Sequence, residues 1–271
     1  RGLGDVYKRQ EYVCHVASKT NTLRELPFVN EIYQYSTSKG PLEPVNQLRD
    51  LGVIICPDLS WTSHISTICN KAKQKAAWVL SVFHSRSPMV MLTLYKSLVR
   101  SLLEYCSPLW NPSKVSDIQQ LESVQKTFTS RIAGCQDLDY WERLQKLSLM
   151  SLQRRRERFI ILTMWKILHG QTSNDLNIMF QTRPRTGTKA VIPSISRHSS
   201  ASHQSLYDSS FAVMGPKLWN CVPNNLNTMV QFELFKKNLT TFLLSVPDLS
   251  LIHISEPTRP ERISYAVVCV K

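Results

Sequence analysis

Apolar residues recur every three or four positions through the middle of this 271-residue chain. The first such run consists of Ile65, Ile68, Ala72, Ala76, Val79 and Phe83. This spacing gathers the apolar side chains on one face of an α-helix, and Ser60 or Thr62 can cap its first turn. The helix is expected to end before Pro88, which suits the first turn of a second helix.

The same periodicity predicts further helices up to residue 170. The second helix has its apolar positions at Met91, Leu92, Tyr95, Leu98, Val99, Leu102 and Tyr105, and the third at Ile118, Leu121, Val124, Phe128 and Ile132. Gly134 is a natural end for the third helix. A short helix follows through Trp141, Leu144 and Leu147. A longer helix is expected from Ser151 to Gly170.

A short β element precedes these helices. The run from Leu51 to Ile55 is apolar and β-branched, and Pro57 with Asp58 bounds it, so its length suits a buried strand followed by a turn. Apolar pattern returns from Phe211 to Val246, where a small helical segment is expected to dock onto the preceding helices. The pattern therefore predicts a mainly α fold, a helical bundle with a short β element on its N-terminal side.

The two ends of the chain differ in pattern from the rest. Residues 1–10 and 249–271 look like translated adapter or cloning tails, with genuine flexible termini as the alternative. Residues 171–210 are basic and rich in Ser and Thr, which is typical of an exposed linker. Fold prediction therefore concerns mainly residues 11–170 and 211–248.

The charge balance indicates a polyanionic partner. The chain has 33 Lys and Arg against 20 Asp and Glu, a net charge of +13, and its pI is near 9.5. Basic groups gain free energy by displacing counterions from nucleic acid. An ordinary solvated surface is the alternative, and an anionic membrane surface is a weaker one because no apolar run reaches the ~20 residues that span a bilayer.

Two basic clusters fall on predicted helices and are the candidate nucleic-acid contacts. The first comprises Lys71, Lys73 and Lys75, and the second comprises Arg154, Arg155, Arg156 and Arg158. Basic helical faces follow phosphates without reading sequence. Ordinary solvated faces would have the same composition, so that alternative stays open for both clusters.

The sequence offers no complete catalytic or metal site. It has no Asp-Asp pair to hold two magnesium ions, and Asp50, Asp58, Asp137 and Asp139 fit turn or cap positions. The histidines and cysteines lack metal-ligand spacing, so neither a metal nor another cofactor is expected. Seven scattered cysteines suggest reduced thiols, as in the cytosol or nucleus, although the intracellular location stays open.

Several short segments stand in a distinctive order and spacing between residues 45 and 245. They are Arg49 to Val53, Asp58 to Trp61 with His64-Ile65, Leu94 to Arg100, Leu103 to Tyr105, Leu109 to Pro112, Leu121 to Lys126, Leu152 to Arg156, Trp219-Asn220 and Val222-Pro223. Together they resemble the region after the polymerase core of non-LTR, jockey-like retrotransposon reverse transcriptases. The resemblance implies a palm end in residues 11–57, a helical thumb in 58–170 and a post-thumb segment in 211–248.

The resemblance also implies roles and partners. Leu51 and Gly52 would lie near the strand turn that supports the primer end, and the helices after Trp61 would hold an RNA and DNA template–primer duplex. The catalytic aspartates and their Mg²⁺ would belong to the upstream palm and fingers of the same polyprotein. The sequence thus predicts a non-catalytic reverse transcriptase fragment that binds nucleic acid, with a helical protein-interaction or structural module as the alternative.

Overall fold

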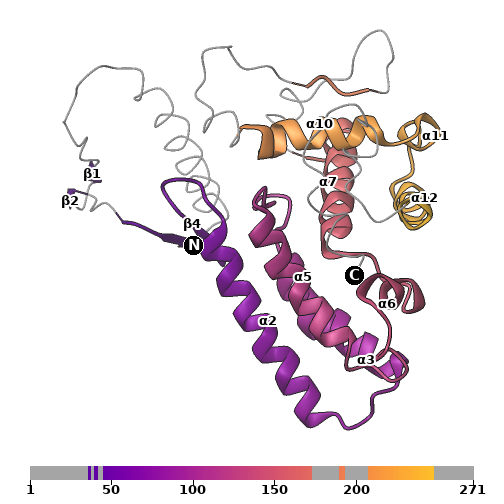
Figure 1. Cartoon of the computed structure of the whole chain (residues 1–271). Helices are drawn as coiled ribbons and strands as arrows, with labels where there is room; N and C mark the ends of the chain where they lie inside the picture. The colour runs from indigo at the N-terminus through magenta and orange to yellow at the C-terminus, as the bar shows by residue number, and fades with distance from the viewer. Residues whose placement is uncertain (1–35, 38–39, 42–44, 173–188, 193–206, 247–271) are drawn as a thin grey trace. The chain divides into compact units, whose positions relative to one another are not determined.

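The computed structural model describes residues 36–37, 40–41, 45–172, 189–192 and 207–246 (Figure 1). The chain divides into two compact units, residues 1–60 and 61–271. The sequence tails predicted for residues 1–10 and 249–271 lie outside the described residues, as does most of the predicted linker. No helix among the described residues has both the length and the apolar character needed to cross a bilayer.

The described residues of the first unit form two short antiparallel strand pairs. One pairs β1 (Ser36–Thr37) with β2 (Gly40–Pro41), and the other pairs β3 (Leu48–Asp50) with β4 (Val53–Ile55). Cross-strand pairing fixes the register of the second hairpin, with Asp50 opposite Val53. Only two residues therefore connect β3 to β4.

Leu51 and Gly52 form this connection, so the predicted strand begins two residues later than expected. Their φ angles are +45° and +91°. A two-residue hairpin turn with positive φ at both positions matches the right-handed twist of its strands, and glycine adopts such a conformation without steric cost. Leu51 tolerates it less easily, because a Cβ crowds the backbone in this region.

The second unit begins with the long helix α2 (Thr62–Val82), which confirms the predicted apolar face. Its buried residues are His64, Ile65, Cys69, Ala72, Ala76 and Val79. The predicted cap is wrong, because Trp61 occupies the N-cap position without a side-chain hydrogen bond. The Thr62 hydroxyl instead donates to Asp117 Oδ2 at 3.0 Å, which ties the start of α2 to another helix.

The predicted second helix is interrupted by a π-helical turn. It consists of α3 (Pro88–Leu94), η1 (Tyr95–Val99) and α4 (Arg100–Glu104). The buried residues of this run are Met91, Tyr95, Val99 and Leu103. A π turn holds more residues than an α turn, so it displaces the buried face. Leu98 and Leu102 are consequently only half-buried, and Tyr105 is exposed.

Two further helices follow as predicted. Helix α5 (Val115–Thr129) packs against α2 and buries Leu121, Val124 and Phe128, and the chain turns at Gly134, where φ is +74°. Helix α6 (Tyr140–Lys146) begins with a reciprocal capping box in which the Asp139 carboxylate accepts from the Glu142 N–H.

Helix α7 (Leu152–Leu168) carries the core of the C-terminal part. It packs against α10 (Phe211–Cys221) and α12 (Phe232–Ser245), and α11 (Asn224–Asn227) lies between them in sequence (Figure 1). Trp165 and Trp219 both contact Phe235 in this core. The described residues thus confirm the predicted mainly α fold with a short β element, including the docking of the terminal helices.

Candidate nucleic-acid interface

The three candidate lysines of α2 are all exposed, but they do not form one row. Successive residues of an α-helix are separated by about 100° around its axis. Lys71 and Lys75 therefore lie one above the other on one flank, whereas Lys73 lies on the opposite flank. The buried face of α2 separates these two flanks.

Trp78 completes the flank that holds Lys71 and Lys75, and we call these three residues the α2 flank. The Lys75 Nζ lies 4.9 Å from the centroid of the Trp78 ring, a cation–π distance. The indole remains 49% exposed, and its other neighbour is the edge-on ring of Phe83 at 6.4 Å. Sequence reasoning missed Trp78, although its position three residues after Lys75 on the polar side of α2 was a usable signal.

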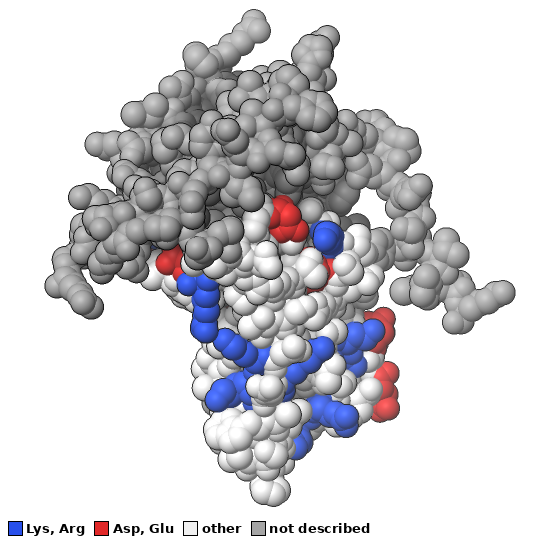
Figure 2. Space-filling model, turned by 90° about the vertical axis from the view of Figure 1, so that its left-hand side faces the viewer, with Lys and Arg blue, Asp and Glu red and all other residues white. Residues whose placement is uncertain are grey.

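The electrostatic character of this side of the molecule is positive. Figure 2 looks onto the α2 side and shows lysine and arginine side chains gathered over the described surface, with acidic side chains toward its margins. Some acidic residues of this unit are covered by its own elements, such as Glu122, whose Oε2 accepts from the Tyr140 hydroxyl at 2.5 Å. A polyanion would therefore meet a predominantly basic surface here.

The arginine cluster of α7 is not the exposed basic face that its sequence suggests. Arg154 and Arg156 are only 1% and 2% exposed. Arg154 forms an ion pair with Glu157 at 3.5 Å, and burial lowers the pKa of Arg156, with Glu122 as the largest opposing charge. Both guanidiniums are therefore buried rather than on the exposed basic face expected from the sequence, and contact of this cluster with nucleic acid remains a prediction.

The other two arginines of the cluster, Arg155 and Arg158, are half-buried. Arg155 binds the Glu104 carboxylate through both Nε and Nη2, the latter at 2.9 Å from Oε2. The Nε of Arg158 donates to the Thr240 hydroxyl at 3.0 Å. The structure therefore separates the four arginines into two buried groups and two partly exposed ones.

The primer-support candidates belong to the first unit. Leu51 and Gly52 are both exposed at the tip of the β3–β4 hairpin. Their exposure and backbone geometry are compatible with contact to a ligand, whereas the role in primer support remains a prediction.

The described residues contain no group of three or more metal-ligating side chains. Two of the isolated aspartates occupy the turn and cap positions expected of them. Asp58 Oδ1 accepts from the Ser60 N–H at 3.0 Å, and Asp139 caps α6. Cys69 and Cys135 are buried free thiols. Burial raises the pKa of Cys69 to about 11, so this sulfur is protonated and is not a poised nucleophile.

Parts of this chain are similar to known proteins. It is 27% identical over 129 residues to an uncharacterized protein of Caenorhabditis elegans, covering 46% of this chain and 65% of that protein. It is 26% identical over 99 residues to a probable RNA-directed DNA polymerase from the transposon X-element of Drosophila melanogaster, covering 35% of this chain and 11% of that protein. No protein-family model and no solved structure matches. Part of the chain is therefore related to a transposon RNA-directed DNA polymerase, and the chain spans only part of each relative.

Proposed function

We propose that this chain is a non-catalytic part of a retrotransposon RNA-directed DNA polymerase and that it binds template–primer nucleic acid on the α2 flank. The observation that carries the proposal is the exposed Trp78 ring beside two exposed lysines one helical turn apart. The partial similarity to a transposon polymerase and the net charge of +13 support it.

The chemistry of the flank suits a nucleic acid better than another polyanion. Lys71 and Lys75 supply positive charge for two phosphates without sequence preference. Trp78 offers a flat ring on which an unpaired base can stack, a contact that phosphate-only ligands do not use. The helices from α2 to α7 would then act as the thumb, with the palm and fingers of the same polyprotein supplying the aspartates and Mg²⁺.

A protein-interaction module is the second candidate, favoured by apolar residues at the turn between α2 and α3. Val82 is exposed at the end of α2, and Met89 is 84% exposed at the start of α3. Exposed apolar groups of this kind are common at protein-docking surfaces. Salt dependence separates the two candidates, since an apolar contact need not weaken with ionic strength.

The test is binding of the chain to an RNA–DNA duplex with an unpaired overhang across a salt series, using wild type and the double variant Lys71→Gln/Lys75→Gln. Each phosphate neutralised contributes about 0.9 to the slope of log affinity against log salt for a duplex. The double variant should therefore bind more weakly. The slope of its log affinity against log salt should be shallower than that of the wild type by about 1 to 2. Trp78→Ala should weaken binding of the overhang, and Trp78→Phe should restore part of it.

The matched control is Lys126→Gln/Lys237→Gln, which removes the same charge from exposed positions on α5 and α12. If the control loses as much affinity and slope as the α2 variant, binding comes from diffuse charge and the α2 flank is not the site. Salt-independent or absent binding by the folded protein would favour the protein-interaction candidate.

A further inference from the structure

We propose that Arg100, Arg155 and Arg158 form a binding site for a phosphate group, which we call the arginine triad. It is separate from the α2 flank and draws residues from two helices that are distant in sequence. Arg100 begins α4, whereas Arg155 and Arg158 lie one turn apart on α7. Binding of free phosphate would not depend on the proposed function; binding of a nucleic-acid phosphate rests on it.

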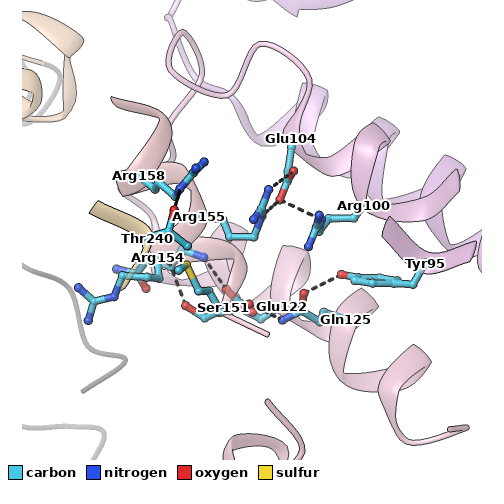
Figure 3. A network of polar contacts seen from close by, with 12 residues as sticks. Tyr95, Arg100, Glu104, Glu122, Gln125, Ser151, Arg154, Arg155, Arg158 and Thr240 are labelled. Atoms are coloured by element: carbon cyan, nitrogen blue, oxygen red, sulfur yellow. Dashed lines mark hydrogen bonds and ion pairs between the residues drawn. The ribbon is translucent and has the colours of Figure 1, made fainter. Parts of the chain in front are cut away.

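Among the described residues, Glu104 is the carboxylate that pairs with members of the arginine triad. Figure 3 shows Glu104 between Arg100 and Arg155, with Arg158 beside them and bonded to Thr240. Arg155 binds Glu104 in bidentate fashion, and the Arg100 Nε lies at the longer distance of 3.5 Å from Glu104 Oε1. The strongest geometry thus pairs Glu104 with Arg155.

The charges of the cluster do not balance. Arg100 and Arg155 pair with Glu104, whereas Arg158 pairs with no carboxylate of the described residues. Three guanidiniums thus face one carboxylate, which leaves two positive charges that the described ion pairs do not neutralise. The side chains are largely removed from water, with exposed fractions of 15% for Arg100, 17% for Arg155 and 12% for Glu104. Burial, followed by the charge of Arg155, lowers the pKa of both Arg100 and Arg158. Partly desolvated like charges of this kind are costly unless an anion joins them.

Phosphate is the anion that fits best. A guanidinium presents a planar fork of N–H donors that pairs with two phosphate oxygens, and a phosphate carries about the charge that the cluster lacks. Arg158 gives its Nε to the neutral Thr240 hydroxyl rather than to a carboxylate, and that hydroxyl in turn donates to the Lys236 carbonyl oxygen at 2.7 Å. Thr240 therefore orients Arg158 without neutralising it.

The first experiment titrates the full chain with inorganic phosphate at constant ionic strength, against chloride, and follows thermal unfolding. A ligand at about ten times its Kd should raise Tm by roughly 3–6 °C for a chain of this size. Arg158→Gln and Arg100→Gln should abolish the phosphate-specific rise. Lys237→Gln, which removes one exposed charge from α12, should retain it.

A second measurement tests the site on the wild-type protein, so it remains informative even if a charge-removing variant fails to fold. The ¹⁵N–¹H signals of the arginine Nε groups are recorded for the wild type with and without phosphate, and Arg158→Lys assigns the Arg158 signal while keeping its charge. Shifts confined to a few Nε signals, including that of Arg158, support the site. A Tm rise no larger than that in chloride, together with unmoved Nε signals, overturns the proposal.

A short oligonucleotide then distinguishes the source of the phosphate. If inorganic phosphate competes with it and Arg158→Gln weakens its binding by about tenfold, the arginine triad receives a backbone phosphate. If Arg158→Gln removes the phosphate response but leaves oligonucleotide affinity unchanged, the site takes free phosphate, and the proposal still stands. If the α2 flank does not bind nucleic acid, only the oligonucleotide measurements change, and the response to inorganic phosphate stays the same. The two proposals can therefore be contradicted independently.

Discussion

At the level of single residues, a ring contact between His64 and Trp110 joins the start of α2 to the loop after α4. The His64 ring is buried and meets Trp110 edge-on, with ring centroids 5.2 Å apart. The Trp110 Nε1–H in turn donates to the Tyr105 carbonyl oxygen at 2.8 Å. Burial, followed by the charge of Lys71, lowers the pKa of His64 below its usual 6.5. The neutral imidazole is therefore the form that the fold favours.

This preference predicts a loss of stability in mild acid. A lowered pKa in the folded state means that the contribution of His64 is fully present above about pH 6.5 and is lost as pH falls through the folded-state value. Tm should therefore decrease below that pH, and His64→Gln should flatten the decrease. The exposed His84 provides the matched control, His84→Gln. A pH profile unchanged by His64→Gln would contradict this role.

The contact between α10 and α7 depends on the absence of a side chain at Gly215. An added Cβ would lie 2.7 Å from Met164 Sδ and 3.0 Å from Met164 Cγ, closer than such atoms pack. Gly215→Ala is therefore expected to lower the free energy of unfolding by about 1–3 kcal/mol, less the gain of up to ~1 kcal/mol from helix propensity.

Chemical denaturation of four proteins would measure this effect. They are the wild type, Gly215→Ala, Met164→Leu and the double variant Gly215→Ala/Met164→Leu. The shorter leucine should relieve part of the clash, so that the cost of Gly215→Ala becomes smaller in that background. Equal costs in both backgrounds would show that the Met164 contact is not responsible.

At the element scale, the π turn decides which residues of the second helical segment are buried. It places the Tyr95 hydroxyl 2.7 Å from Gln125 Oε1, and the Gln125 amide donates to the Tyr140 hydroxyl at 2.9 Å. Tyr140 continues the chain to Glu122, whose pKa is raised by burial. Tyr95, Gln125, Tyr140 and Glu122 thus form one connected hydrogen-bond network that joins η1, α5 and α6.

Helix α12 is held on α7 by its apolar face, and two neighbouring residues allow a matched test. Phe235 is buried against Trp165 and Trp219, whereas Leu234 beside it is exposed. Phe235→Ala should cost about 3–5 kcal/mol in the free energy of unfolding, because it removes contacts and leaves a cavity. Leu234→Ala should cost less than about 0.5 kcal/mol. Similar losses in denaturant midpoint for both variants would contradict the packing.

At the scale of the whole molecule, the helical unit holds its own core. Helices α3, α4 and α5 belong to the same unit as α2, and α10 and α12 pack on α7. A chain lacking residues 1–60 is therefore expected to keep a cooperative thermal transition, with a Tm within a few degrees of that of the full chain. Far-UV circular dichroism during heating would measure it. A broad, non-cooperative transition would show that the first unit is needed for folding.

The helices and their buried faces could be predicted from residue order alone, because side-chain periodicity is a local property. Ile65, Ala72 and Val79 follow the 3.6-residue repeat and are buried in α2. Departures arose where one residue changed the register or the backbone. At the π turn, Leu98 and Leu102 are only half-buried although both were expected on the apolar face, and Gly52 turned the predicted start of a strand into a hairpin turn.

Only the tertiary structure decided which basic residues can meet a ligand. Lys75 and Arg156 look alike in sequence, each within a run of positive charges on a helix, yet Lys75 is exposed beside Trp78 and Arg156 is buried. The physical reason is that exposure depends on how much of a helix other elements cover, and α7 buries ten of its 17 residues whereas α2 buries six of its 21. The same packing brought Arg100 to Arg155 and Arg158 across more than fifty positions of sequence, a proximity that no local pattern encodes.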